Sequence, residues 1–242
     1  MSVADILHND KKKIAWLCDP DKTYGDALLY AGNTAQKAGI DLILIGGSLV
    51  QENHLDECIT ALRSVTEIPI VLFPGNGMQF SDKADAILFL SLLSGRNPDL
   101  LIGQHVNIAY RLHKSNMEVI PTGYILIDGG EPTSVSYMSN TFPIPRDKTN
   151  IAVSTALAGK LLGMQAIYLE AGSGAPLCVP NRTIKATKET TNMPLFVGGG
   201  IRNAKTASMM FHLGANVVVI GTAVEENPDC LFDIVSSVQN KI

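Results

Sequence analysis

A chain of 242 residues is long enough for one domain of barrel size with a sizeable core. Its apolar fraction of 46% and charged fraction of 17% argue against long disordered segments. The net charge of −4, from 19 basic and 23 acidic residues, excludes a general attraction to nucleic acid or anionic lipid. Any anion that the protein binds must therefore meet a local positive potential.

The four cysteines are widely scattered, without metal-ligand spacing or a redox dithiol motif, so we expect reduced thiols in a cytoplasmic protein. Residues 1–10 are polar and no apolar segment follows them, so we expect no signal peptide. No apolar run approaches the ~20 residues that span a bilayer. The five histidines form no metal-ligand pair at helical spacing.

Eight apolar, β-rich runs recur along the chain, at residues 14–18, 42–45, 69–73, 86–90, 119–127, 166–170, 195–197 and 217–220. Their nearly continuous hydrophobicity is typical of parallel strands covered on both faces. Helix-like segments lie between most of them, at residues 24–38, 49–64, 98–114, 150–162 and 204–213, and another helix is expected from about residue 227. This order predicts a modified TIM (β/α)8 barrel, with residues 1–242 forming a single domain.

Two connections depart from the regular barrel. Residues 74–85 are only 12 residues long and join the third and fourth strands. A parallel crossover needs about a dozen residues including its helix, so we expect a reduced or absent third helix. Residues 128–148 are rich in Gly, Pro, Ser and Thr, and a long loop at the exit of a barrel strand is more often a functional lid than a linker.

In such a barrel the active site lies at the C-terminal ends of the strands. The first exit carries an Asp-Pro-Asp-Lys sequence beginning at Asp19, which offers carboxylate ligands to Mg²⁺ and a counter-charge for phosphate. It could equally be a turn in which Asp19 caps the following helix. The second exit carries a Gly-Gly-Ser sequence ending at Ser48, whose hydroxyl is a candidate ligand-binding group or a helix N-cap.

The sixth exit carries an acidic residue. Tyr168 and Glu170 are two residues apart, so both face the side of the strand opposite to Leu169. Glu170 is a candidate general base, or an acceptor that orients a substrate hydroxyl. The alternative is a surface charge at the end of a strand.

Glycines mark the seventh and eighth exits, at residues 198–200 and at Gly221, which precedes Thr222. Backbone N–H groups freed by glycine, with the positive end of a short helix, form the phosphate cradle that many barrels build there. The cradle does not name the reaction, because sugar-phosphate isomerases and flavin enzymes use it too. Arg202 could assist the phosphate or pair with an acid, and Arg96 and Asn97 could meet a second anion or form a turn before a helix.

These motifs, taken together, resemble those of the geranylgeranylglyceryl phosphate synthase family, which includes the heptaprenylglyceryl phosphate synthases. The resemblance extends from about residue 15 to residue 225. Its most specific part is the Tyr-Leu-Glu segment beginning at Tyr168, followed by the ordered glycine sites. Members of that family are modified barrels with a reduced third helix, in agreement with the short connection at residues 74–85.

The resemblance implies transfer of a polyprenyl group, expected to be geranylgeranyl, from its diphosphate to the primary hydroxyl of sn-glycerol 1-phosphate, with release of diphosphate. By motif, Asp19 and Ser48 would bind Mg²⁺, and Glu170 and Tyr168 would be catalytic. The prenyl tail would lie in an apolar groove along the barrel. Glycerol phosphate would be held by Tyr168, Leu169, Glu170, Ala171, Gly172, Ser173, Gly174, Gly199, Gly200, Gly221 and Thr222.

One position departs from part of the family. Leu17 stands two residues before the first aspartate, where one branch of the family carries a lysine near the glycerol phosphate. Together with the Ala-Gly-Ser-Gly-Ala-Pro sequence that begins at Ala171, this resembles the branch that lacks the lysine.

Two other classes of protein compete with this interpretation. One is another phosphate-binding TIM-barrel enzyme, either a sugar-phosphate isomerase that uses Asp19 and Glu170 or an FMN-dependent oxidoreductase. The other is a non-catalytic barrel that binds a phosphorylated metabolite or a lipid, which the clustering of reactive groups at strand exits argues against. As to partners, we expect no nucleic acid, no transmembrane segment, at most a transient contact with a membrane, and a homo-oligomer.

Overall fold

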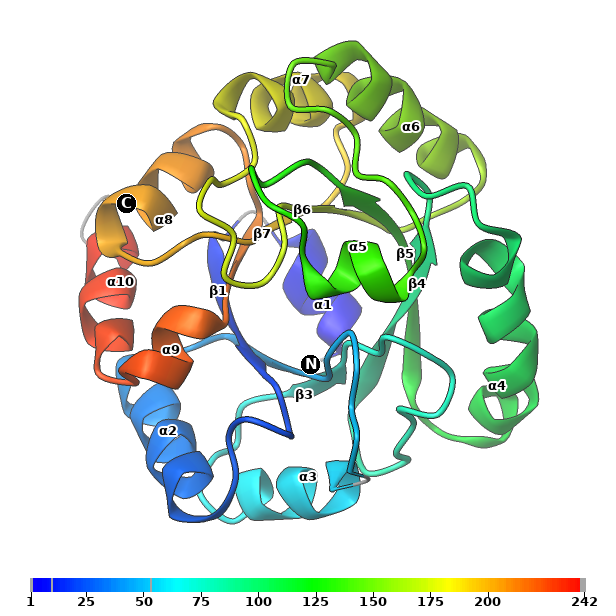
Figure 1. The fold of residues 1–242 in the computed structure, drawn as a ribbon. Helices are drawn as coiled ribbons and strands as arrows, with labels where there is room; N and C mark the ends of the chain where they lie inside the picture. Colours follow the sequence, from blue (N-terminus) through cyan, green and yellow to red (C-terminus); the bar gives the residue numbers. More distant parts are fainter. Residues whose placement is uncertain (1, 10, 53, 240–242) are drawn as a thin grey trace.

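Eight parallel strands close into one barrel in the order in which they occur in the chain (Figure 1). The structure is a computed structural model that describes residues 2–9, 11–52 and 54–239. Strand β1 pairs with both β2 and β8, which closes the ring. The predicted TIM barrel is thereby confirmed. The strands are β1 (Lys13–Cys18), β2 (Leu42–Ile45), β3 (Ile70–Leu72), β4 (Ala86–Leu92), β5 (Glu118–Leu126), β6 (Ala166–Glu170), β7 (Leu195–Gly198) and β8 (Val217–Ile220).

Helices surround the barrel in Figure 1. The longer ones are α2 (Gly25–Ala38), α3 (Leu55–Arg63), α4 (Gln104–Lys114), α6 (Thr149–Leu161), α7 (Asn181–Thr191), α8 (Ala204–His212) and α10 (Cys230–Gln239). A π-helical turn, η1 (Asp99–Gly103), leads into α4. Three short helices are α1 (Val3–His8), α5 (Ser134–Met138) and α9 (Thr222–Glu226). No helix in the described part of the chain is both long and apolar enough to cross a membrane.

The connection between β3 and β4 contains no helix, as residues 73–85 are described entirely as turns, bends and irregular backbone. This confirms the prediction that the third helix of a regular barrel, between the third and fourth strands, is reduced or absent. The predicted start of the preceding helix at residue 49 is wrong, because α3 begins only at Leu55. Residues after β2 instead run as a loop in which the Gln51 N–H donates to Asp21 Oδ2 at 2.6 Å.

Consecutive strand residues pack in two different layers. Tyr168 and Phe196 lie in the barrel interior, whereas Leu169 and Val197 lie in the layer between the barrel and its helices. Because both layers are apolar, the strands read as continuous hydrophobic runs in the sequence. The same alternation carries Glu170 to the inner side of β6.

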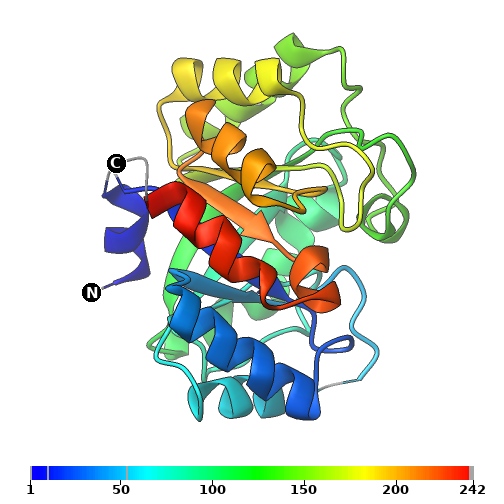
Figure 2. The ribbon, with the colours of Figure 1, turned by 90° about the vertical axis from the view of Figure 1, so that its left-hand side faces the viewer.

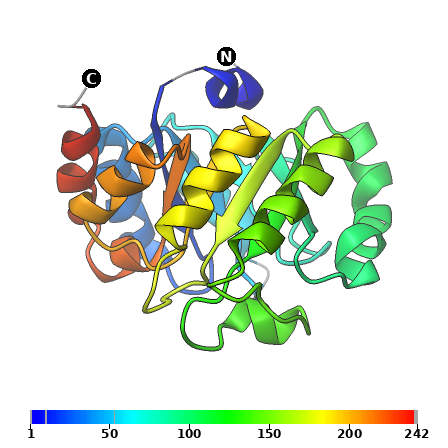
Figure 3. The same cartoon turned by 90° about the horizontal axis from the view of Figure 1, so that it is seen from above.

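Helix α1 closes one end of the barrel. Its first N–H groups, those of Val3 and Ala4, donate to the Glu118 carboxylate at 2.7 and 2.8 Å. Val3 and Leu7 pack against the interior residues of the barrel. Figures 2 and 3 show α1 at one end of the barrel and the loops that carry α5 at the opposite end. The C-terminal ends of the strands therefore form the open face.

Candidate active site

A polar cavity of about 460 Å³ lies at the C-terminal ends of the strands. Its lining comes from the ends of seven strands, all except β4, and from the loops that follow them. Of the residues predicted from the sequence, it includes Asp19, Ser48, Tyr168, Glu170, Ser173, Gly174, Gly199, Gly200, Gly221 and Thr222. The barrel thus brings most of the predicted site together.

Three residues of the predicted segment do not line this cavity. The side chains of Leu169 and Ala171 are buried in the layer beneath the helices. Gly172 lies behind the wall, where a Cβ atom would be 2.9 Å from Thr133 Cβ. Any contact of these three residues with a substrate would therefore come from their backbone groups and not from a side chain, so the role of residues 168–174 as a whole stays a prediction.

Glu170 is buried, with 5% of its surface exposed, although it belongs to the polar cavity. Burial raises the pKa of Glu170 to about 7, against the opposing effect of a hydrogen bond from the Gly172 N–H to Oε1 at 2.6 Å. A carboxyl group with this pKa is suited to accept a proton near neutral pH. Burial likewise raises the pKa of Tyr168, so its phenol stays neutral.

The glycines at the end of β7 make room for this carboxylate. A Cβ atom on Gly198 would lie 2.5 Å from the Tyr168 hydroxyl and 2.7 Å from Glu170 Oε2, and one on Gly199 would collide with Glu170 Oε1. Gly199 also has a positive φ of 86°, which disfavours any side chain. The sequence suggested only a phosphate-binding role for these glycines, so their packing against Glu170 is a structural finding.

The predicted phosphate cradle lies beside them. Gly199 and Gly200 are both left-handed, and Thr222 is the first residue of α9. The hydroxyls of Ser173 and Thr222 are 3.4 Å apart across the cavity wall. The Arg202 guanidinium lines the cavity and donates to the Gly174 carbonyl at 3.0 Å, which joins the loops after β6 and β7.

An acidic corner lies on the other side of the cavity. Lys22 Nζ is 3.4 Å from Asp19 Oδ2 and 3.6 Å from Glu225 Oε2. Burial raises the pKa of Glu225, and Lys22 opposes this effect. Sequence reasoning missed Glu225, although its position five residues after the end of β8 was a usable signal. Within the described ranges, no three His, Cys, Asp or Glu side chains form a metal-binding group by themselves.

Gln79 connects the second and third exits. Its Oε1 accepts the N–H groups of Gly47 and Gly75, each at 3.2 Å, and its Nε2 donates to the Gly47 carbonyl at 2.8 Å. The side chain is buried. These bonds hold the loop that carries Ser48, and no sequence pattern pointed to them.

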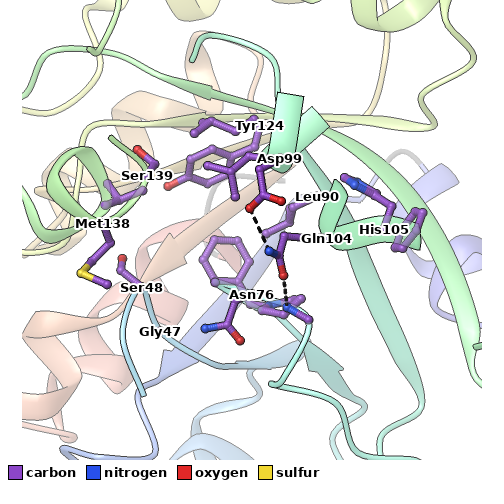
Figure 4. Close-up of a pocket in the computed structure, with 18 of the residues that line it drawn as sticks. Gly47, Ser48, Asn76, Leu90, Asp99, Gln104, His105, Tyr124, Met138 and Ser139 are labelled. Carbon is purple, nitrogen blue, oxygen red and sulfur yellow. Dashed lines mark hydrogen bonds between the residues drawn. The ribbon is translucent and has the colours of Figure 1, made fainter. Parts of the chain in front are cut away.

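An apolar groove of about 270 Å³ opens beside the polar cavity, between the exits of β3 and β4 and helix α4 (Figure 4). It occupies the side of the barrel where the third helix is missing. Its apolar lining includes Phe89, Leu90, Leu92, Leu100 and Ile108. Figure 4 shows Ser48 and Met138 on one side of the groove and Gln104 and His105 on the other.

The two cavities meet. Gly47, Ser48, Phe73, Tyr124 and Val135 line both of them. The Tyr124 ring stacks on Tyr168 with centroids 5.3 Å apart, which continues an aromatic surface from the groove toward Glu170. A molecule in the groove can therefore reach the carboxylate side of the polar cavity.

The loop at residues 128–148 lies over both cavities, in agreement with its interpretation as a lid. Val135 of α5 lines both cavities, and Met138 lines the groove. Asn97 ties this loop to η1, since its Nδ2 donates to the Ser139 carbonyl at 3.1 Å and its Oδ1 accepts the Asp99 N–H. This favours the helix-start turn for Asn97, and Arg96 lines neither cavity.

Comparison with known proteins identifies the family of the chain. The family model described as the PcrB family matches residues 7–239. A geranylgeranylglyceryl phosphate synthase from Chitinophaga pinensis is 47% identical over 227 residues, covering 94% of this chain and 90% of the relative. Another from Spirosoma linguale is 45% identical, covering 94% and 91%.

The solved structure of a relative has the same fold and contains a bound ligand. The (S)-3-O-geranylgeranylglyceryl phosphate synthase of Thermoplasma acidophilum, in complex with its substrate sn-glycerol-1-phosphate, superposes with a TM-score of 0.93. It is 33% identical and 99% of each chain is covered. With relatives at this level of identity, the barrel is that of a prenyltransferase. The chain belongs to the PcrB family.

Proposed function

We propose that this enzyme transfers a polyprenyl group, namely geranylgeranyl, from its diphosphate to the primary hydroxyl of sn-glycerol 1-phosphate. The observation that carries the proposal is the junction of a polar, glycine-lined cavity with an apolar groove at Ser48 and Tyr124. A hydrophilic phosphate ester and a hydrocarbon tail need these two environments. The ligand of the Thermoplasma acidophilum relative supports the polar substrate.

Glu170 is the proposed general base. The glycerol hydroxyl oxygen forms a bond to C1 of the prenyl group, the bond between C1 and the diphosphate oxygen breaks, and the hydroxyl proton passes to Glu170. The pKa of about 7 supports this role, because much of the carboxyl is ionised at neutral pH. Tyr168, two residues before Glu170 on the same face of β6, is the residue proposed to orient the carboxylate.

The substrate phosphate has its proposed site at the exits of β7 and β8. Backbone N–H groups of Gly200, Gly221 and Thr222 supply donors there, with the Ser173 hydroxyl close to Thr222. Arg202 adds positive charge at the rim of the same cavity. Leu17 lines this cavity too and offers no charge, so the backbone donors carry more of the binding.

Mg²⁺ is the proposed cofactor, with Asp19 and Ser48 as its protein ligands. Both line the polar cavity, and a Cβ atom on Gly47, next to Ser48, would lie only 3.3 Å from Asp19 Oδ2. One carboxylate and one hydroxyl suit a cation that usually keeps waters and takes further oxygens from substrate phosphates. When bound, the cation would offset charge on the departing diphosphate.

The test is incubation of purified protein with Mg²⁺, sn-glycerol 1-phosphate and prenyl diphosphates of graded length, followed by mass analysis of the ether. We expect one ether product from each donor used, formed fastest with the geranylgeranyl donor, and little product from the sn-glycerol 3-phosphate control. Yellow purified protein, or turnover of a sugar phosphate without any prenyl donor, would instead support one of the other phosphate-binding barrel enzymes.

We also propose a homo-oligomer in the cytoplasm. Ile102, Val106 and Tyr110 are spaced four residues apart on one face of η1 and α4, and each is more than half exposed. In a two-fold dimer, antiparallel packing of this face would bring Asp99 of one copy near Lys114 of the other. Light scattering of wild type and Val106→Glu tests the interface, and equal molar masses would contradict it.

The proposed compartment is supported by the cysteines. The four free cysteines fit a reducing compartment.

A further inference from the structure

Large apolar side chains stand exposed around the open face of the barrel. Tyr137 and Phe142, in the loop after β5, are 85% and 92% exposed, and Met78, in the loop after β3, is 86% exposed. Loops that follow parallel barrel strands share one face. Figure 3 shows the α5 loop on this face, opposite α1.

This exposed surface continues into the two cavities. Met138, which follows Tyr137 in the chain, is half exposed and also lines the apolar groove. Figure 4 shows Met138 at the edge of this groove. Leu49 is half exposed and lines the polar cavity. We define Leu49, Met78, Tyr137, Met138 and Phe142 as the apolar rim.

We propose that the apolar rim docks on a lipid bilayer and that the prenyl donor passes from the bilayer into the groove. The proposal rests on the proposed function, since a polyprenyl diphosphate is itself a membrane lipid. Exposed aromatic side chains are typical of the membrane–water interface. A second copy seated on the rim would cover the mouth through which substrates must pass, which favours a bilayer as the occupant.

The net charge of the chain indicates which kind of interaction would drive docking. A net charge of −4 gives no attraction to anionic lipid, so docking must come from apolar side chains inserted into the interface. Binding should therefore occur on zwitterionic vesicles and should change little between low and high salt. An adsorption driven by charge would show the opposite dependence.

The first measurement is co-sedimentation with phosphatidylcholine vesicles. We expect Tyr137→Ser/Phe142→Ser to lower the partition coefficient at least about tenfold, given the apolar area removed. The matched control is Leu161→Ser/Leu162→Ser, two residues that are 86% and 73% exposed at the end of α6, on the closed side of the barrel. The control should bind vesicles as wild type does.

The second measurement compares donors. None of the four substituted residues lines either cavity, so turnover with a short, water-soluble prenyl diphosphate should stay within about twofold of wild type. With a geranylgeranyl donor embedded in vesicles, turnover by the rim variant should fall below that of wild type, by about as much as its binding to vesicles falls. Equal loss with both donors would mean that the substitution disturbs the site, and would overturn donor entry from the bilayer.

Docking is overturned if wild type fails to bind the vesicles, or if the rim variant binds them equally well. A rim variant of lower molar mass in light scattering would show a self-interface and would also overturn it. Failure of the proposed function looks different. No ether would then form from any donor, while vesicle binding would still decide the docking surface.

Discussion

The backbone N–H of Gly172 donates a 2.6 Å hydrogen bond to Oε1 of Glu170, a carboxylate buried at the inner end of β6. This bond stabilises the ionised form, whereas burial favours the neutral form by a larger amount. The balance leaves the pKa at about 7, so both protonation states are accessible at neutral pH. Glu170 can thus both accept and return a proton.

The rate of ether formation should depend on this balance. Turnover should rise with pH through about 7, because only ionised Glu170 accepts the hydroxyl proton. Glu170→Gln should lower kcat by ~10²–10⁴ while glycerol phosphate still binds, since the amide oxygen can accept the Gly172 N–H. A pH–rate profile and calorimetric binding of glycerol phosphate measure the two effects. Unchanged kcat would remove Glu170 from the proposed role.

Stability should show the opposite dependence on pH. The pKa of Glu170 rises from 4.5 to about 7 on folding, so between these values the folded chain holds a proton that the unfolded chain has lost. The free energy of unfolding should therefore decrease as pH rises across this window, by up to about 3 kcal/mol from this group. Urea unfolding at pH 5 and pH 8 measures it, with Glu170→Gln as reference. Parallel curves for both proteins would contradict the shift.

Gly199→Ala should abolish most turnover, because its Cβ atom would collide with Glu170 Oε1. Gly163→Ala is the matched control, since Gly163 has a similar φ of 88° but open space around its Cβ position. Gly163→Ala should lower stability by about 1 kcal/mol through backbone strain, and Gly199→Ala should lower it further, because its Cβ would also lie 2.7 Å from the backbone N atoms of Ala171 and Gly172. Thermal unfolding and kcat separate strain from collision, and equal activity of the two variants would contradict the collision.

Removal of Mg²⁺ by a chelator should stop turnover, and added Mg²⁺ should restore it. Asp19→Asn should raise the Mg²⁺ concentration needed for half-maximal rate by more than ~10-fold. Loss of a residue that only hydrogen-bonds to a metal ligand already costs about that much, and Asp19 is proposed to be a ligand itself. Calorimetric titration of Mg²⁺ in the presence of diphosphate gives a readout independent of turnover. Wild-type affinity in the variant would exclude Asp19 as a ligand.

Gln79→Leu should destabilise the open face of the barrel. The change leaves the N–H groups of Gly47 and Gly75 without their acceptor, at about 1–3 kcal/mol each if water does not replace it. Gln79→Glu keeps an acceptor oxygen and should lose less. Urea unfolding measures the difference, and the loop that carries Ser48 should become more susceptible to proteolysis in the leucine variant.

The barrel was predictable because its strands are buried on both faces. The predicted limits of β2, β6 and β8 agree with the structure, since continuous apolar runs end where the chain leaves the core. Helix α7 was missed because Asn181–Thr191 is polar and rich in threonine, a weak helix former. It forms through packing of residues such as Ile184 and Thr187, which are buried.

The sequence by itself determined which reactive groups occur and at which strand exits, from Asp19 and Ser48 to Glu170 and Thr222. That was enough to predict one site, because a parallel barrel brings all its strand ends to the same face. Only the tertiary structure decided the burial of Glu170, the space left by the glycines at the end of β7, the contact of Lys22 with Glu225 and the groove beside α4. These features depend on distances of a few ångströms between segments remote in the chain, and no local pattern of residues encodes such distances.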